Sequence, residues 1–379
     1  MKYCKKCLMP DSKPFIKFDD EGVCNACRAH EKKKEHLEHI DWRERRKEFD
    51  AYVEAGRSKK APFYDVLVPV SGGKDSIYQV HTALEKNLRV LAVNVDYGIK
   101  TEIGIENLNV VPKMGATLIT MRPEQNFHNR MIRIGFEDFG DPDLMSHALL
   151  YAYPLWVAVN FSVPLVFEGE NSAFEYGGDK ISGQKNRIDR DWFYKYIVTK
   201  GITPDYISKN YDIPMERLKV YSFPEEELAQ KDIKAIFLGY YFNWDSEYHL
   251  SVAMKYGFRP LPEPREGTFR NYVGIDEKIN RIHQFMKVLK FGYGRATDHA
   301  CEDIRAGRLT RKEAIALVRK HDVQALSDEH VEPFCKLLGY SKDQFWKIMD
   351  KYCNKDICRI KKNGELEITG HKDFEEVVK

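Results

Sequence analysis

The stretch that decides the fold is Asp65-Val-Leu-Val-Pro-Val-Ser71-Gly-Gly-Lys-Asp75-Ser76-Ile-Tyr-Gln-Val80. Its hydrophobic, β-branched first part predicts a short strand that ends at Val70, and the residues from Ser76 onward predict a helix that reaches about Lys86. Between them lies a small polar turn whose two glycines let the backbone approach an anion closely. The amides of this turn and of the helix N-terminus point at the same place, with the helix dipole behind them. The stretch therefore predicts a phosphate-binding loop.

The loop is not a Walker A motif, which would need Gly where Val68 stands and Ser or Thr where Asp75 stands. Ser-Gly-Gly-Lys-Asp-Ser after a hydrophobic strand instead resembles the pyrophosphate loop (PP-loop) of the N-type ATP pyrophosphatases, which have an adenine nucleotide alpha hydrolase-like fold. In that superfamily ATP is cut between its α and β phosphates, and AMP is placed on a substrate oxygen. The resemblance implies that ATP is bound by Val70, Ser71, Gly72, Gly73, Lys74, Asp75 and Ser76. An ordinary strand-to-helix turn is the alternative.

Four further hydrophobic runs follow this loop, and each has the length of a buried strand. They are Arg89–Asp96, Ala116–Arg122, Val163–Asn171 and Ile233–Tyr240. Runs of this type that alternate with helical stretches predict an α/β fold with a doubly wound parallel sheet. Ligands of such sheets bind at the carboxyl ends of the strands.

Polar residues stand at those carboxyl ends, and we expect them to line one crevice with the loop: Asn94, Asp96, Glu168, Glu170, Asn171 and Asp245. Asn94 and Asp96 are predicted to contact ATP, and Asn171 and Asp245 the second substrate. Asp75 is the predicted Mg²⁺ ligand, because a hard cation that bridges phosphates prefers carboxylate oxygens. Lys74 would offset phosphate charge, and Glu170 is predicted as a second metal ligand or a base. A capping or solvated carboxylate is the alternative for each acid.

Two cysteine pairs precede this domain. Cys4-x2-Cys7 and Cys24-x2-Cys27 are separated by sixteen residues, and each has the spacing that places two thiolates on one side of a tight turn. Together they predict a structural Zn²⁺ site with four thiolate ligands. Redox pairs or disulfides are the alternative, which a reducing cytoplasm disfavours. A ribbon of this size cannot bury enough surface to fold alone, so we expect the metal to supply its stability.

The sequence suggests four regions. Residues 1–30 are predicted as the zinc ribbon, 31–60 as a helical connector, 61–245 as the PP-loop domain and 246–379 as a helical substrate or partner region. Within the third, residues 171–218 are long, polar and rich in glycine, lysine and arginine. Such an insertion is either a lid over an anionic substrate or a mobile surface loop.

The composition and the net charge of the chain exclude some classes of protein. The chain has 379 residues, of which 43% are hydrophobic and 31% charged, and its net charge is +2. This balance argues against a dedicated nucleic-acid or membrane-surface binder. No signal peptide is visible. The uncharged stretch Leu144–Phe167 is divided by Pro164 into a helix-length and a strand-length piece, so we expect a buried helix and a buried strand rather than a membrane span. We expect a cytoplasmic protein.

The C-terminal region predicts helices. Asp276 is expected to cap the first, and Thr310-x-x-Glu313 and Ser341-x-x-Gln344 are capping boxes that open two more. Between the first helix and these boxes lies Lys290-Phe-Gly-Tyr-Gly-Arg295-Ala-Thr-Asp298-His299. Lys290, Arg295 and Asp298 are the candidates for binding an anionic group of the substrate, and a structural helix C-cap is the equal alternative.

Taken together, several motifs resemble the N-acetyl sugar amidotransferase family of bacterial surface polysaccharide (lipopolysaccharide O-antigen) and nonulosonic-acid (pseudaminic-acid type) biosynthesis. They are Cys4-Lys-Lys-Cys7-Leu-Met-Pro10, Cys24-Asn-Ala-Cys27, Pro69 to Ser76, Gly169-Glu170-Asn171 and Lys290 to Asp298. The resemblance implies that a sugar acetamido group becomes an acetamidino group at the expense of ATP and ammonia. It leaves open whether the sugar is a nucleotide-linked diacetamido-uronic acid or a free nonulosonic acid.

The ammonia source is expected to be another protein. Residue 2 is Lys2 rather than a processed N-terminal cysteine, and no cysteine lies in a nucleophile elbow. The family resemblance implies a separate, histidine-biosynthesis-like glutaminase, with a cyclase-like subunit as a further partner. One rival is a tRNA-thiolating PP-loop enzyme, but no cysteine occurs between Cys27 and Cys301 and no broad basic surface is evident. The other is a zinc-ribbon scaffold that senses a nucleotide.

Overall fold

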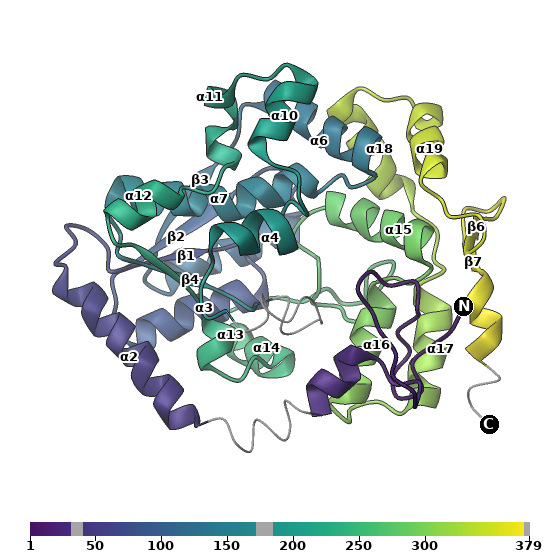
Figure 1. Cartoon of the computed structure of the whole chain (residues 1–379), viewed down its shortest axis with the longest axis horizontal. Helices are drawn as coiled ribbons and strands as arrows, with labels where there is room; N and C mark the ends of the chain where they lie inside the picture. Colours follow the sequence, from purple (N-terminus) through teal and green to yellow (C-terminus); the bar gives the residue numbers. More distant parts are fainter. Residues whose placement is uncertain (32–40, 172–184, 375–379) are drawn as a thin grey trace. The chain divides into compact units, whose positions relative to one another are not determined.

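The computed structural model describes residues 1–31, 41–171 and 185–374 (Figure 1). Its internal contacts divide the chain into two units, and both are discontinuous in sequence. Unit 1 consists of Met1–Ile40, Arg133–Asp143 and Leu261–Lys379, and unit 2 of Asp41–Ile132 and Leu144–Pro260. This division differs from the expected one in two ways. The cysteine ribbon is grouped with the C-terminal helices, and unit 2 ends at residue 260 rather than 245.

Unit 2 is built on one parallel sheet of five strands in the order β3-β2-β1-β4-β5. The strands are β1 (Val66–Pro69), β2 (Val90–Val95), β3 (Thr117–Met121), β4 (Leu165–Glu168) and β5 (Lys234–Phe237). All neighbouring pairs are parallel. The predicted doubly wound sheet is therefore confirmed. The sheet switches direction between β1 and β4, which is where open α/β sheets bind ligands.

Helices join these strands. Those that lie wholly in unit 2 are α2 (Trp42–Ser58), α3 (Lys74–Glu85), α4 (Glu102–Leu108), α5 (Val110–Lys113), α7 (Leu144–Phe161), η1 (Trp192–Ile197), α10 (Pro204–Tyr211), α11 (Met215–Leu218), η2 (Lys219–Tyr221), α12 (Glu225–Gln230), α13 (Leu238–Tyr241) and α14 (Ser246–Lys255). The uncharged helix α7 is mostly buried, and Pro164 separates it from β4, as predicted. Across the described ranges, no helix combines the length and the apolar character that a bilayer crossing requires.

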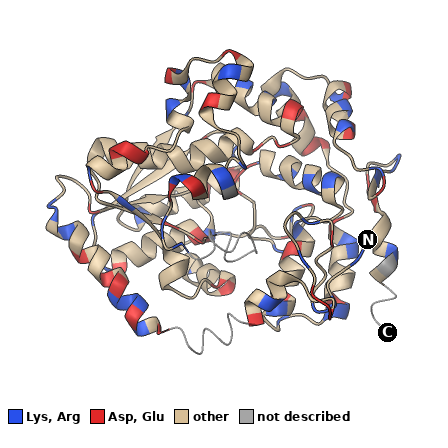
Figure 2. Cartoon of the chain, in the orientation of Figure 1, with Lys and Arg blue, Asp and Glu red and all other residues tan. Residues whose placement is uncertain are grey.

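Helix α2 shows why the connector is helical. Its buried residues include Phe49 and Val53, which pack in the core of unit 2 together with Phe167 of β4. Asp41 caps the helix by accepting hydrogen bonds from the amides of Arg43 and Glu44. Along its remaining surface, basic and acidic side chains alternate (Figure 2). The charge pattern is that of an exposed helix face.

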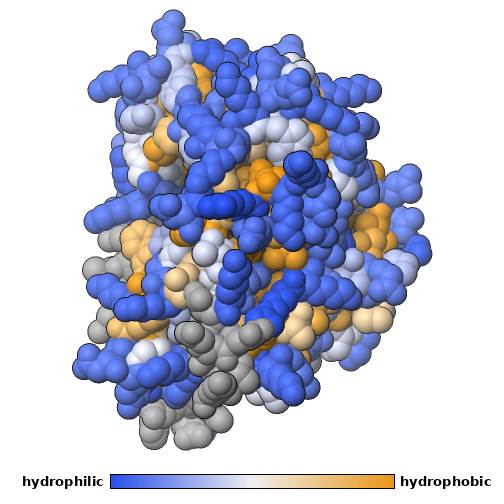
Figure 3. Space-filling view, turned by 90° about the vertical axis from the view of Figure 1, so that its right-hand side faces the viewer, coloured by the Kyte–Doolittle hydropathy of each residue, from blue (hydrophilic) through white to orange (hydrophobic). Residues whose placement is uncertain are grey.

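Unit 1 is mainly helical. It includes the C-terminal part of α6 (Gln125–Phe139), and its other elements are α15 (Ile279–Phe291), α16 (Arg295–Arg305), α17 (Arg311–His321), α18 (Asp328–Leu338), α19 (Lys342–Lys351), β6 (Cys358–Ile360), β7 (Leu366–Ile368) and η3 (Thr369–Phe374). Strands β6 and β7 form an antiparallel pair. On the face shown in Figure 3, hydrophilic side chains surround smaller apolar areas.

Three helix N-caps were predicted in unit 1, at Asp276, Thr310 and Ser341, and the structure shows where these helices begin. Both capping boxes are present, at Thr310 and at Ser341. The predicted cap at Asp276 is wrong, because α15 begins three residues later. There Glu277 accepts a hydrogen bond of 2.7 Å from the amide of Ile279. Two adjacent acids precede this helix, and sequence alone does not show which of them turns back onto the first amides.

Candidate active site

The loop after β1 has the conformation that an anion cradle requires. Gly72 has a φ of +93°, and a Cβ at this position would lie 2.8 Å from the backbone nitrogen of Leu108, so a larger residue would be strained and would clash. The Ser71 hydroxyl accepts a hydrogen bond of 3.1 Å from the amide of Gly73. Helix α3 begins at Lys74, two residues before the predicted start. Its first amides thus lie next to the glycine turn.

A cavity of about 300 Å³ lies at the carboxyl ends of β1, β2 and β4, against α7. It is lined by Pro69, Val70, Ser71, Asp75, Ser76, Gln79, Val93, Val95, His147, Leu150, Tyr151, Pro154, Glu168, Gly169 and Glu170. The structure therefore brings Ser71, Asp75 and Ser76 of the loop together with Glu168 and Glu170 at the end of β4. The predicted loop residues Gly72, Gly73 and Lys74 do not line this cavity. The cavity also lies at the point where the strand order reverses, the expected place for a nucleotide.

Asp75 is held by two donors. Its Oδ2 accepts from Lys74 Nζ at 2.6 Å, and its Oδ1 accepts from His249 Nδ1 at 2.8 Å. Burial acts to raise the pKa of Asp75, but the Lys74 charge and the His249 hydrogen bond outweigh it, so the pKa lies below its usual range. Each carboxylate oxygen keeps a second lone pair. This ionised group, in a cavity with two further carboxyls, fits a hard cation such as Mg²⁺.

Glu168 has the opposite character. It is buried, and its Oε1 has no hydrogen-bond partner among the residues that the structure describes. Burial first, and then the negative charge of Glu170, raise the pKa of Glu168 to about 8. Glu168 therefore carries a proton at neutral pH while Asp75 is ionised. Two carboxyl groups whose environments separate their pKa values in one cavity are typical of acid–base sites.

The raised pKa of Glu168 predicts that the stability of the protein depends on pH. The folded state keeps the Glu168 proton up to about pH 8, whereas an ordinary glutamate loses it near 4.5. The stabilisation linked to this proton is complete below the ordinary pKa and is lost as the pH rises toward 8. Glu168→Gln removes this titrating group. Between about pH 5 and about pH 8, we therefore expect the free energy of unfolding to fall in the wild type relative to that of the variant.

Denaturant titrations across that pH range measure the effect. Glu85→Gln, at the far end of α3, is the control and should follow the wild type at each pH. Parallel stability curves for Glu168→Gln and the wild type would contradict the assigned environment.

Three predicted site residues have structural contacts and are absent from the cavity lining. The Asn94 side chain donates to the Val70 carbonyl at 2.7 Å, and Asp96 accepts from Arg122 Nε at 2.6 Å. Asn171 donates to the Lys185 carbonyl and accepts from the Trp192 indole. These contacts fix the ends of the strands. The expectation that the three line the same crevice is therefore not met, although the buried Oδ1 of Asn94 has no partner in the described ranges.

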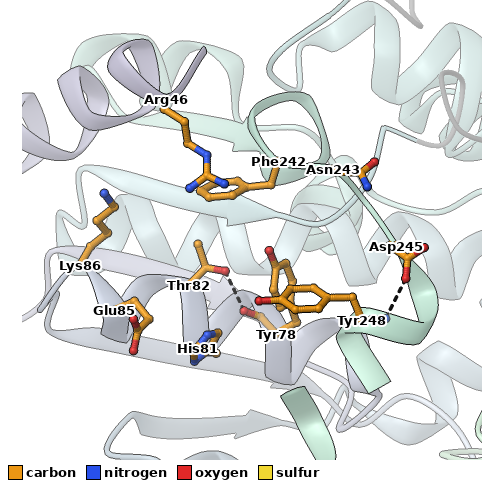
Figure 4. A pocket seen from close by; sticks show the side chains of 10 residues that line it. All are labelled: Arg46, Tyr78, His81, Thr82, Glu85, Lys86, Phe242, Asn243, Asp245 and Tyr248. Carbon is orange, nitrogen blue, oxygen red and sulfur yellow. Dashed lines mark hydrogen bonds between the residues drawn. The ribbon is translucent and has the colours of Figure 1, made fainter. Parts of the chain in front are cut away.

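Asp245 lies elsewhere as well. It caps α14 by accepting from the Tyr248 amide at 2.8 Å and lines a second cavity of about 660 Å³ (Figure 4). In this cavity, Arg46 of α2 lies over the Phe242 ring, and side chains of α3 form the opposite wall. The sequence placed Asp245 with the loop because it follows β5. A short helix, α13, lies between them and carries the chain away from the strand end.

No pattern in the sequence indicated His249 as a site residue. It lies on α14, is completely buried, and contacts Asp75 across 174 positions of sequence. Gln79 was also missed, and its side chain lines the cavity and donates to the Phe167 carbonyl at 3.0 Å. Its position one turn after Asp75 on the predicted helix was the available signal.

In unit 1, the predicted substrate-binding stretch connects two helices. Gly292 has a φ of +70° and ends α15, and Arg295 is the first residue of α16. Lys290 donates to the carbonyls of Phe139 and Gly140 at 2.8 and 3.0 Å, and Asp298 pairs with Lys287. Gly292 is thus a helix C-cap, as the structural alternative predicted, and substrate binding by Lys290, Arg295 and Asp298 stays a prediction. Of the predicted lid, residues 172–184 lie outside the described residues. In the part that follows them, Trp192 is fully buried.

The four N-terminal cysteines meet as predicted. All four Sγ atoms lie within 4.8 Å of one another and are buried. The Cys4–Cys27 and Cys7–Cys24 sulfur distances are 3.9 and 3.7 Å, close to the ~3.8 Å edge of a tetrahedron whose metal–sulfur bonds are ~2.3 Å. The Cys24 amide donates to Cys4 Sγ at 3.2 Å, a contact that favours a thiolate. All eight cysteines are free thiols. The donor set and geometry fit Zn²⁺ and exclude disulfides within the cluster.

Comparisons with known proteins give one family match. Residues 266–367 match the family described as "LPS biosynthesis protein WbpG-like, C-terminal domain". This segment lies in unit 1. No curated protein matches the chain. Among solved structures, NMN synthetase from Francisella tularensis matches 80% of this chain and 96% of its own, at 10% identity and a TM-score of 0.37.

Proposed function

We propose that this chain is the synthetase subunit of an ATP-dependent amidotransferase that converts a sugar acetamido group to an acetamidino group and releases AMP and pyrophosphate. The observation that carries the proposal is the cavity in which Ser71, Asp75 and Ser76 of the loop meet Glu168 and Glu170, with Lys74 bonded to Asp75. The match to a lipopolysaccharide-biosynthesis domain supports a polysaccharide precursor as the substrate, as do the motifs of the N-acetyl sugar amidotransferases.

The chemistry needs a nucleotide for a simple reason. An amide carbonyl is a weak electrophile and its oxygen cannot leave, so ammonia alone does not convert an amide to an amidine. In the proposed reaction, the amide oxygen attacks the α-phosphorus of ATP, which forms an O-adenylyl imidate and releases pyrophosphate. Ammonia then adds to the imidate carbon, and AMP departs with the former amide oxygen. The site must therefore stabilise pyrophosphate and later accept a proton.

The residues of the cavity suit these tasks. The loop amides and the Lys74 ammonium stabilise the charge of the departing pyrophosphate. Asp75 would hold Mg²⁺, which neutralises phosphate charge when bound. We propose Glu170, which lines the same cavity, as the base that takes the proton that the attacking ammonia loses. We propose Zn²⁺ as the metal of the cysteine cluster, with a structural role, because four thiolates leave no open position for a substrate.

Ammonia requires a source. At neutral pH most of it is protonated, and only the neutral form attacks. We propose a separate glutaminase subunit as the partner, which supplies ammonia to the cytoplasmic enzyme. The rival tRNA-thiolation reaction relays sulfur through cysteines, and none of the residues that line the cavity is a cysteine.

The test uses an acetamido sugar whose carbonyl carries a heavy oxygen isotope, incubated with the protein, ATP, Mg²⁺ and ammonium. We expect the sugar to show the mass change of oxygen replaced by NH, and the isotope to appear in AMP. The reaction should run with ammonium, and with glutamine only after a glutaminase is added. Formation of ADP, or isotope retained in the sugar, would overturn the proposal.

A further inference from the structure

His249 lies behind Asp75 and is more deeply buried than the group that it contacts. Its side chain is 0% exposed, whereas that of Asp75 is 40% exposed. Its Nδ1 is 2.8 Å from Asp75 Oδ1, and because an ionised carboxylate only accepts hydrogen bonds, Nδ1 is the donor. Its Nε2 has no hydrogen-bond partner within the described ranges. Among the described residues, the imidazole therefore makes its hydrogen bond through Nδ1, and that bond is to Asp75.

Aromatic rings fix the orientation of this imidazole. It is stacked on Tyr78, with ring centroids 3.9 Å apart and an interplanar angle of 16°, and it meets Trp244 edge-on at 4.4 Å and 79°. Tyr78 belongs to α3 and follows Asp75 by three residues, so both lie on the same side of that helix. The stack therefore fixes the imidazole relative to the helix that carries Asp75.

The two hydrogen bonds of Asp75 differ in permanence. Lys74 donates to Oδ2, but the proposed function assigns the same ammonium to the phosphates of ATP. His249 approaches Oδ1 from α14, is fully buried and does not line the cavity. Once Lys74 contacts phosphate, His249 remains as the donor that fixes the plane of the carboxylate.

We propose that His249 is a positioning residue, which orients the Asp75 carboxylate so that it presents its free lone pairs to the cation of the metal–nucleotide complex. This inference rests on the proposed function, since it assigns Asp75 to that cation. Hydrogen bonds of this kind behind a metal ligand change metal affinity or activity by about 10- to 100-fold when removed. The ring does not itself touch the nucleotide.

Three variants separate the hydrogen bond from the packing. His249→Phe keeps an aromatic ring against Tyr78 and Trp244 but has no donor. His249→Asn keeps a donor close to the place of Nδ1 and loses the ring. His81→Phe is the matched control, because His81 lies on α3, as Asp75 does, but bonds to the Tyr256 hydroxyl at 2.9 Å. If His249→Phe does not fold, His249→Leu serves as the donor-free variant.

The readout is the affinity for Mn²⁺ in the presence of a non-cleavable ATP analogue, measured by electron paramagnetic resonance, with analogue binding in EDTA as the check on folding. We expect His249→Phe to weaken Mn²⁺ binding by about 10- to 100-fold, and His249→Asn to restore most of it. His81→Phe should match the wild type. Equal Mn²⁺ affinity in His249→Phe and the wild type, or an equal loss in His249→Asn and His249→Phe, overturns the inference.

The rate of pyrophosphate release distinguishes this failure from failure of the proposed function. A wild-type protein that forms AMP and pyrophosphate while His249→Phe binds Mn²⁺ normally contradicts the role of His249 alone. A wild-type protein that forms neither product contradicts the proposed function, and the assignment of His249 fails with it.

Discussion

Asp75→Asn is expected to lower the rate of pyrophosphate release by about 100- to 1000-fold. The carboxylate lies at the mouth of the phosphate loop with a lowered pKa, and it is the ionised acid that can hold the cation there. Asn keeps an oxygen that can accept from His249 but loses the negative charge that pairs with Lys74 and that the proposed Mg²⁺ would need. The protein should therefore fold and still bind ATP weakly, and the chemical step should be lost.

The measurement is a coupled pyrophosphate assay with an acetamido sugar and ammonium, next to calorimetric titration of ATP. Glu85→Gln removes an acid from the other end of the same helix and should keep the wild-type rate. An Asp75→Asn protein that retains full pyrophosphate release would show that Asp75 is not the metal ligand. A wild-type protein that binds ATP and releases no pyrophosphate with any sugar would instead support the nucleotide-sensor alternative.

Cys24→Ser is expected to have the second large effect, on folding rather than on chemistry. Structural zinc contributes about 10–16 kcal/mol of binding free energy in small zinc-dependent domains, and a serine oxygen replaces a thiolate poorly. We expect the proposed zinc to be lost and the stability of the ribbon to decrease by at least roughly 5 kcal/mol. Ala300 and Val318, in α16 and α17, belong to the same hydrophobic cluster and should lose protection with it.

Metal content by mass spectrometry and hydrogen exchange of the N-terminal segment test this expectation. Cys335→Ser is the control, because Cys335 is a buried thiol of α18 outside the four-cysteine cluster. Zinc content that is one per chain in the wild type and unchanged in Cys24→Ser would contradict the assignment. So would a wild type that contains no zinc after purification without chelators.

The sequence predicted those features that are encoded locally. Five hydrophobic runs became five parallel strands. Four of them, β1, β2, β4 and β5, are mostly buried, and a strand buried on both faces has a continuous apolar sequence. The edge strand β3 is partly exposed. The cysteine cluster and both capping boxes could also be predicted from the sequence, since each depends on motifs of residues a few positions apart. The loop was recognisable because two glycines and a Lys-Asp-Ser run directly follow a hydrophobic strand, and in the structure Gly72 has the positive φ that favours glycine.

Features that depend on packing between distant segments could not be predicted from the sequence. The contact of His249 with Asp75 arises from the packing of α14 against α3. Asp245 was misplaced because one short helix separates it from the end of β5. The buried environment that raises the pKa of Glu168 is likewise made by the whole fold and not by its neighbours in sequence.

The contact between the cysteine segment and α16 has a consequence for biosynthesis. The Leu8 amide donates to Cys301 Sγ, and 293 residues separate the two. A ribosome that adds about 5–20 residues per second needs roughly 15 to 60 seconds to make that interval. During this time the four thiols are outside the exit tunnel and their packing surface does not yet exist. Early capture of the metal would protect these nascent thiols from oxidation until the last third of the polypeptide is translated.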